Sequence, residues 1–273
     1  MQKHIYLLYL FCLLLFATSS IAQPYTLRHL GIEDGLSNNY VTKIAQDEQG
    51  CIWIATEAGL NRFNGKDFTI YNTNNSAING NALNTLLYDK EENKLWVGSK
   101  TGVSIMNCTT LQFESTTFLD TINMNNNITS LSFAADSGIW VANHYHKIIH
   151  YSKKNGKVKT LSNENINGFP HSLLSVFDNK KGQLYVGHAT EGMSIIDLKS
   201  NSLKHYQNNP HDPKSLPGGS VYCICIDHLE NIWVGTNQGL ALFNPVTEDF
   251  QVFRYEPGNP YSLISNHIYD IKE

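Results

Sequence analysis

Charged residues are scarce in this sequence, and positive charge is not in excess. Of 273 residues, 16% are charged, and 20 basic residues against 24 acidic ones give a net charge of −4. Such a chain lacks the basic surface that binding to nucleic acid or to anionic lipid requires. Hydrophobic residues still make up 41% and aromatic residues 11%, which excludes bulk disorder. The composition therefore indicates a folded globular chain without a nucleic-acid partner.

Long apolar runs are absent except at the N-terminus. Residues 5–16 are all hydrophobic and follow Lys3 and His4, but this run is shorter than the roughly 20 residues of a spanning helix. Ser20 and Ala22 are small residues at positions −3 and −1 of a cleavage site before Gln23. We therefore expect residues 1–22 to be a signal peptide, with an uncleaved anchor as the alternative. The rest, residues 23–273, is expected in the periplasm without a membrane span.

Cysteine is also rare. Beyond Cys12, which lies in the apolar run, there are four: Cys51, Cys108, Cys223 and Cys225. Their spacing matches neither a metal site nor a secreted disulfide framework. We expect them to be buried as small hydrophobic residues, and we expect no bound metal or cofactor. A disulfide between Cys51 and one of the others remains the alternative.

One pattern is abundant: a short apolar segment with an aromatic anchor occurs five times. The steps between successive anchors are 43, 44, 45 and 48 residues. A period of about 40–50 residues made of short strands is typical of a β-propeller, in which each repeat is one blade of four strands. We expect the anchors to pack between blades, and they are Trp53, Trp96, Trp140, Tyr185 and Trp233.

The first repeat shows the four expected strands: 40–46, 51–56, 60–64 and 67–71. Turn residues separate them, including 47–50 and Asn64-Gly65. Two sets of residues recur at equivalent turns. The glycines fit a turn that needs positive φ, and they are Gly59, Gly102, Gly192 and Gly239. The acidic residues are expected to form turns without a chemical role, and they are Asp47, Asp89, Asp178 and Asp227.

The two ends of the chain resemble parts of blades. Residues 25–30 (YTLRHL) resemble an outer strand such as 250–255, and residues 264–273 resemble the inner strand at 37–47. We therefore expect five complete blades and a partial sixth, as in a fragment of a longer protein with a propeller of seven blades.

The repeat resembles a known family. The pattern xIWVGTxxGLxxFN after an Asp-rich turn is similar to the two-component regulator propeller repeat, and so are the connecting segments 208–227 and 256–271. The resemblance covers residues 24–273. It is looser in the third unit, where Lys147 replaces the turn glycine, and in the fourth, where Tyr185 replaces Trp.

The resemblance implies a role in signalling. Members of this family are sensor regions of hybrid two-component histidine kinases that respond to oligosaccharides and control polysaccharide-utilisation genes. We accordingly expect an oligosaccharide ligand, a homodimer, and a second propeller and kinase region in the full-length protein. The sequence shows no kinase histidine box, nucleotide-binding motif or receiver aspartates, so we expect no enzymatic activity from this chain itself.

The candidate ligand-binding residues lie in loops at one rim of the expected propeller. They combine imidazole, phenol and amide groups, which suit sugar recognition by hydrogen bonding and stacking. The candidates are His144, Tyr145, His146, His188, Asn38 and Asn39. His144 and His146 could bind a metal ion together, but His150 is expected further along the next strand and no third ligand is obvious. We therefore expect no metal at this cluster.

Two other functional classes remain open. One is a stand-alone secreted propeller that binds glycan or protein, and the other is a propeller lyase. The sequence has no nucleophile elbow, cysteine–histidine dyad or phosphate-binding loop, and its scattered carboxylates do not nominate a glycosidase pair. A lyase would consume its ligand, whereas a sensor would return it intact.

Overall fold

The computed structural model describes residues 28–116, 127–144, 147–169 and 172–273, and these residues contain twenty β-strands and one short 3-10 helix, η1 (Ile32–Asp34). The strands form five four-stranded antiparallel sheets within one compact unit, Gly31–Glu273. The β-propeller with five blades is therefore confirmed. The expected signal peptide, residues 1–22, lies outside the described residues, as do residues 25–27 of the segment 25–30.

Each blade is a simple meander of four consecutive strands. The first two blades consist of β1 (Val41–Gln46), β2 (Ile52–Thr56), β3 (Gly59–Phe63) and β4 (Phe68–Tyr71), then β5 (Leu83–Asp89), β6 (Lys94–Ser99), β7 (Gly102–Asn107) and β8 (Gln112–Glu114). The third consists of β9 (Ile128–Phe133), β10 (Ile139–Asn143), β11 (Lys147–Tyr151) and β12 (Val158–Leu161). The last two consist of β13 (Leu173–Asp178), β14 (Gln183–His188), β15 (Met193–Asp197) and β16 (Leu203–Tyr206), then β17 (Val221–Ile226), β18 (Ile232–Thr236), β19 (Gly239–Asn244) and β20 (Asp249–Phe253).

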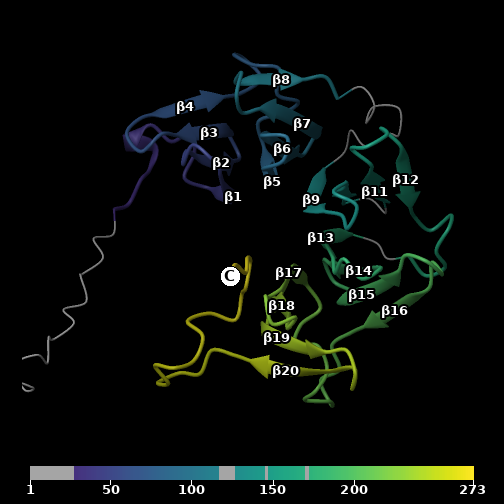
Figure 1. Ribbon diagram of the computed structural model, residues 1–273. Helices are drawn as coiled ribbons and strands as arrows, with labels where there is room; N and C mark the ends of the chain where they lie inside the picture. The colour runs from purple at the N-terminus through teal and green to yellow at the C-terminus, as the bar shows by residue number, and fades with distance from the viewer. Residues whose placement is uncertain (1–27, 117–126, 145–146, 170–171) are drawn as a thin grey trace, which may run out of the picture. The chain divides into compact units, whose positions relative to one another are not determined.

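The first strand of each blade is its inner strand. Successive inner strands contact one another, β1 with β5, β5 with β9, β9 with β13, and β13 with β17. Figure 1 shows these five strands facing a common centre, while β4, β8, β12, β16 and β20 lie at the outside. The inner strands therefore line a central channel.

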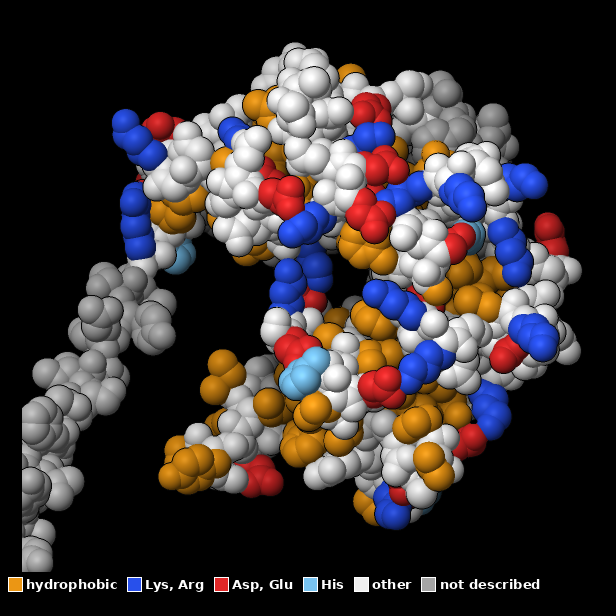
Figure 2. Space-filling model, in the orientation of Figure 1, with side chains coloured by type: hydrophobic (Ala, Val, Ile, Leu, Met, Phe, Trp, Pro, Cys, Tyr) orange, Lys and Arg blue, Asp and Glu red, His pale blue; other side chains and the backbone are white. Residues whose placement is uncertain are grey.

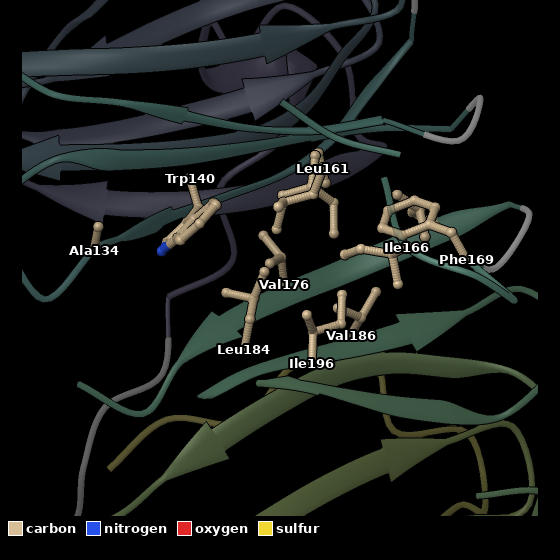
Figure 3. Packing of buried hydrophobic residues seen from close by; sticks show 12 residues of the cluster. Ala134, Trp140, Leu161, Ile166, Phe169, Val176, Leu184, Val186 and Ile196 are labelled. Atoms are coloured by element: carbon tan, nitrogen blue, oxygen red, sulfur yellow. The ribbon is translucent and has the colours of Figure 1, made fainter. Parts of the chain in front are cut away.

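The core lies between the blades. In the cluster between the third and fourth blades, Trp140 packs with Leu161 on one side and with Val176 and Leu184 on the other (Figure 3). Trp53, Trp96 and Tyr185 lie in the equivalent clusters of their blades and are at most 2% exposed. Burying an aromatic side chain of this size contributes roughly 2–3 kcal/mol or more. The interpretation as packing residues is thus confirmed for Trp53, Trp96, Trp140 and Tyr185, whereas Trp233 of the fifth blade is only partly buried.

A small residue on each second strand receives the first residue of the following inner strand. We call the pair a socket and a knob. A methyl group added to the socket Gly98 would lie 2.7 Å from Cγ2 of the knob Ile128, and one added to Gly235 would lie 2.9 Å from Cγ2 of Ile268. Within the same blades such methyl groups would also lie 2.6 Å from Thr85 Cγ2 and 2.4 Å from Cys223 Sγ. These contacts are too close for an alanine, so the knob and the neighbouring inner strand together require glycine.

The other sockets follow the same size rule. Gly187 receives Val221, and a methyl group there would lie 2.7 Å from Cγ1 of that valine. Where the socket is alanine, the knob is leucine, which branches one carbon further out. Ala55 is buried with Leu83, and Ala142 with Leu173. Socket and knob are therefore matched in size at each blade junction.

The C-terminal segment occupies the place of a sixth inner strand. Ile268 donates its backbone N–H to the Thr236 carbonyl at 3.0 Å and fills the Gly235 socket, as Val221 fills that of Gly187. Asp270 forms an ion pair of 2.6 Å with Lys43 of β1. Before this strand the segment leaves Tyr261 and Ile264 exposed, and Figure 2 shows such orange side chains beyond β20. The prediction that residues 264–273 resemble an inner strand agrees with this placement.

The recurrent aspartates form turns, as predicted, and two of them also hold the anchor of their own blade by a hydrogen bond. Asp47 accepts hydrogen bonds from the backbone N–H groups of residues 49 and 51 and from the Trp53 indole at 2.9 Å. Asp227 holds Trp233 in the same way at 2.9 Å, and this hydrogen bond, together with those from Asn231 and Leu229, lowers the pKa of Asp227 to about 2. These carboxylates therefore act in blade packing.

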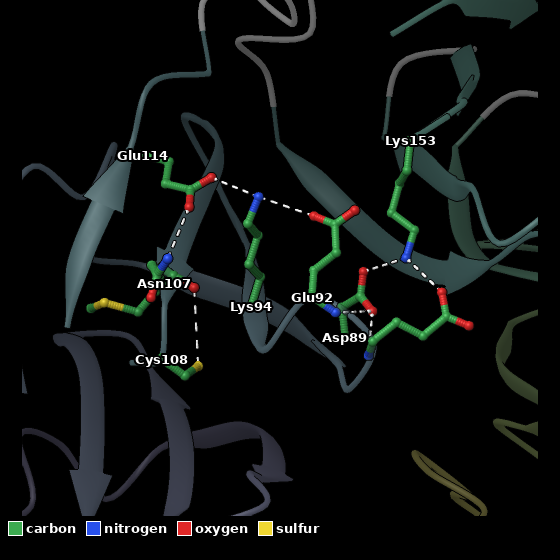
Figure 4. A network of polar contacts seen from close by, with 9 residues as sticks. Asp89, Glu92, Lys94, Asn107, Cys108, Glu114 and Lys153 are labelled. Atoms are coloured by element: carbon green, nitrogen blue, oxygen red, sulfur yellow. Dashed lines mark hydrogen bonds and ion pairs between the residues drawn. The ribbon is translucent and has the colours of Figure 1, made fainter. Parts of the chain in front are cut away.

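The second and third blades depart from this pattern. Ala134 stands where Asp47 stands in the first blade, and the Trp140 indole instead donates to Asp178 of the next blade at 2.8 Å. Asp89 is drawn to Lys153 of the third blade, at 2.6 Å, within the network of Figure 4. The Trp96 indole N–H consequently has no hydrogen-bond partner among the described residues. Hydrogen bonds and ion pairs thus join neighbouring blades as well as residues of the same blade.

Two further expectations about single residues can be compared with the structure. The turn glycines Gly59, Gly102, Gly192 and Gly239 have φ angles of 134°, 143°, 88° and 137°, so positive φ is confirmed at this turn. The four described cysteines are free thiols, and the alternative of a disulfide from Cys51 is wrong. Cys108 and Cys223 are buried, and burial raises the pKa of each thiol to about 12.

Candidate functional site

The clearest surface hollow lies at one mouth of the central channel. The residue after each knob lines it, so that one side chain comes from each blade and one from the C-terminal segment. We call this set the mouth ring, and it comprises Thr42, Asn84, Thr129, Leu174, Tyr222 and Tyr269. The hollow has a volume of about 680 Å³ and is completed by Tyr40, Val41, Lys100, Asn127 and His144.

A β-bulge places each of these side chains. In every blade the pairing between the first two strands skips the mouth-ring residue, as between Val41 and Lys43 or between Val221 and Cys223. A bulged residue leaves the ladder and its side chain is aimed differently from its neighbours. The knob before it can therefore point into the adjacent blade while the mouth-ring residue points into the channel.

One half of the mouth ring is polar and held in place by hydrogen bonds. The Asn84 side-chain amide donates to Asn127 Oδ1 at 2.9 Å and to the Ile128 carbonyl at 2.8 Å. The Thr42 hydroxyl donates to the Leu83 carbonyl at 2.9 Å. Because their hydrogens are used within the protein, these groups present acceptor oxygens to a ligand. They suit the hydroxyl groups of a polar ligand.

The other half of the mouth ring is aromatic. Tyr222 and Tyr269 stack with ring centroids 4.9 Å apart and an interplanar angle of 29°. Tyr269 is 69% exposed, and Tyr40 beside the ring is 64% exposed. Such exposed rings offer an apolar face and a hydroxyl that hydrogen-bonds. The site can therefore hold a ligand that has an apolar face on one side and hydroxyl groups on the other.

The candidate residues predicted from sequence are only partly brought together. His144 lines the hollow, next to Asn127, whose carbonyl accepts its backbone N–H at 2.9 Å. Asn38 and Asn39 do not line it. Their side-chain oxygens accept backbone N–H groups of Tyr40 and Ile32, at 2.6 and 3.0 Å, and so shape the segment that leads to Tyr40. Tyr145 and His146 lie outside the described residues.

His188 is in the fold's interior, which differs from the expected rim position. It is fully buried at the end of β14, where its Nε2 pairs with Ser194 Oγ at 2.9 Å. Burial and the neighbouring His205 lower the pKa of His188 to about 3, so it is neutral near pH 7. Threonine or serine occupies the equivalent strand end in three other blades, as Thr56, Ser99 and Thr236. The expectation of His188 as a surface ligand group was wrong because a strand end, rather than the loop, carries it.

Most of the mouth ring was missed by sequence reasoning, although a positional signal existed. Each ring residue of a blade precedes its aromatic anchor by 11 positions, or by 12 in the second blade. Counting back from Trp233 by 11 gives Tyr222, for example. Strand alternation alone does not predict the bulge that turns this side chain inward.

Comparison with known proteins supports the repeat and the fold. A family described as two component regulator propeller matches residues 35–58 and 215–238. "Histidine kinase P4" of Formosa agariphila is 49% identical over 41 residues, which are 15% of this chain and 3% of that protein.

Solved structures are similar over most of the chain. The extracellular domain of the putative hybrid two component system BT3049 from B. thetaiotaomicron is 30% identical, with a TM-score of 0.76 and coverage of 92% of this chain and 39% of that one. The corresponding domain of BT4673 is 16% identical, with a TM-score of 0.58 and coverage of 88% and 36%, and shows the fold alone.

The chain thus spans about two fifths of the length of the solved relatives and a small part of the kinase. Within the described residues, no helix has the length and apolar character needed to span a membrane. The five blades, the two matching segments and the likeness to the extracellular domain of a putative hybrid two component system together show that this chain carries two-component regulator propeller repeats folded as blades.

Proposed function

We propose that this chain is the ligand-sensing propeller of a hybrid two-component sensor histidine kinase, and that it binds an oligosaccharide at the mouth ring. The observation that supports this most directly is the division of the ring into a polar half with Asn84 and an aromatic half with Tyr222 and Tyr269. A pyranose has the same division, since its C–H faces stack on aromatic rings while its hydroxyl groups hydrogen-bond at the edge.

The wider role follows from the proteins that this chain resembles. We propose that residues 1–22 direct it to the periplasm, and that a second propeller and a kinase region belong to the same protein. In a homodimer, binding at the mouth ring would favour one arrangement of the propellers over another. The kinase would then report ligand to polysaccharide-utilisation genes. Any phosphotransfer would belong to that kinase region, while the propeller binds.

The test is direct binding, beginning with an array of neutral and acidic oligosaccharides and continuing with calorimetry on each ligand found. Tyr269→Ala should weaken binding about fivefold to tenfold, because one aromatic contact contributes roughly 1 kcal/mol. Tyr261→Ala is the matched control, since Tyr261 is 96% exposed and does not line the hollow. Equal affinities of the two variants would contradict the site.

The same experiment separates a sensor from a lyase. After prolonged incubation, mass spectrometry should recover the oligosaccharide intact. Cleaved or unsaturated products would contradict the sensing function.

A further inference from the structure

We propose that the ligand is an acidic oligosaccharide, whose carboxylate or sulfate groups enter the channel beneath the mouth ring. This inference rests on the proposed function and adds the chemical class of the ligand. It comes from the charges that line the channel rather than from the ring itself.

The channel continues directly from the mouth. A second hollow, of about 390 Å³, is lined by the same six mouth-ring residues and by the inner strands below them. Three lysines line this lower part, Lys43, Lys180 and Lys272, and Lys100 lies at the mouth. The carboxylates that line the two hollows are Asp178 and Asp270. Positive charge therefore exceeds negative charge along the channel of a chain whose net charge is −4.

Both carboxylates are already engaged. Asp178 is 4% exposed and accepts hydrogen bonds from the Trp140 indole at 2.8 Å and from the backbone of Ala135 at 3.1 Å, so it is held toward the third blade. Asp270 pairs with Lys43 at 2.6 Å. Lys43 therefore balances the charge of Asp270, whereas Asp178 keeps its charge but directs its carboxylate toward the third blade.

Two of the lysines remain available. Among the described residues, no ion pair within 4.0 Å engages Lys180 or Lys272, and both are exposed. At the mouth, Lys100 pairs with Glu57 at 3.3 Å, with both side chains about half exposed, and such surface pairs contribute little and exchange readily. Figure 2 shows blue side chains bordering the central hollow.

The walls of the channel strengthen this charge. Field lines are concentrated in a cleft with low-dielectric walls, so a small local excess of lysine attracts anions even on a protein of opposite net charge. An acidic glycan can place its ring on Tyr269 and an anionic substituent toward Lys272, three residues further along the C-terminal segment. A neutral glycan can use only the ring contacts.

The experiment compares matched pairs of ligands by calorimetry on the full chain. One pair is tetragalacturonate and its methyl-esterified form, and the other is a sulfated galactan tetrasaccharide and its desulfated form. At least one acidic member should bind about tenfold tighter than its neutral counterpart at 50 mM NaCl, and the advantage should shrink at 200 mM because salt screens the charges. The ligand pair in which the acidic member binds more tightly shows whether the channel prefers carboxylate or sulfate groups.

Variants assign the effect to the channel. Lys180→Gln and Lys272→Gln should each weaken binding of the acidic ligand about threefold to tenfold and leave the neutral ligand unchanged. Lys199→Gln, an exposed lysine in the β15–β16 turn, is the control and should change neither. If the neutral ligands bind as tightly as the acidic ones, or if the channel variants behave like the control, the inference is overturned while the sensing function stands. If no array oligosaccharide and neither pair binds, the proposed function itself fails.

Discussion

His188 makes the stability of the fourth blade depend on pH. Its burial lowers the pKa of the imidazole from 6.5 to about 3, so the folded protein keeps it neutral where the unfolded chain protonates it. The resulting stability is fully present above pH 6.5 and is lost progressively as the pH falls toward 3, because the unfolded state then binds one more proton. At pH 5 the loss amounts to about 2 kcal/mol from this residue alone.

The perturbation that isolates this contribution is His188→Thr. Threonine occupies the equivalent strand end in the first and fifth blades as Thr56 and Thr236, whose hydroxyls donate to the glycine carbonyls of their turns at 3.0 and 2.8 Å. It is therefore compatible with the blade and does not titrate. Urea unfolding of both proteins at pH 7.5 and pH 5.0 gives four free energies of unfolding.

The quantity to compare is the loss between the two pH values. All other titrating groups contribute equally to both proteins, so the wild type should lose about 2 kcal/mol more than the variant. Comparing differences also removes the cost of the substitution itself. Equal losses in the two proteins would refute the reasoning, because they would mean that His188 is protonated as easily in the folded state as in the unfolded one.

Two further substitutions test the contacts between blades. Lys153→Met should lower the free energy of unfolding by about 3 kcal/mol in urea, because it leaves the carboxylate of Asp89, which is 1% exposed, without its cation. The control Lys154→Met, at the exposed neighbouring residue, should change the free energy of unfolding little. A loss no greater than that of the control would show that the ion pair contributes nothing. Gly98→Ala should cost about 1–3 kcal/mol, because its methyl group would overlap both Thr85 and Ile128. Adding Ile128→Leu should recover the part of that loss that Ile128 causes. A double mutant with no recovery would contradict the matching of socket and knob.

The blades could be predicted from sequence because their spacing repeats. The expected strand at 51–56 is observed as Ile52–Thr56, and the anchors, turn glycines and turn aspartates lie where the repeat placed them. Each of these features depends on contacts that recur in four of the blades or in all five. A pattern present five times identifies such contacts without knowledge of the tertiary structure.

Features that differ between blades could not be predicted in the same way. Asp178 looked like one more turn aspartate, yet its carboxylate also accepts a hydrogen bond from the Trp140 indole of the third blade. It does so because the third blade has Ala134 in place of its own aspartate. His188 looked like a loop residue, yet it is the last residue of β14 and its side chain is buried. The mouth ring depends on a bulge, whose position depends on how two strands pair rather than on either strand alone.

The sockets and knobs carry a consequence for exchanging or duplicating blades. Each contact joins two sheets, with the small residue on one and the large residue on the next, so a single sheet is not a self-contained module. Placing the fifth blade after the first would put its valine knob, Val221, into the alanine of Ala55, and placing the second blade after the fourth would put Leu83 against Gly187. The first exchange puts a β-branched side chain against an alanine that otherwise contacts leucine. The second leaves a cavity about the size of a methyl group at the glycine. A module that can be moved intact therefore begins with the strand that carries one socket and ends before the next such strand, cutting each blade between its first and second strands.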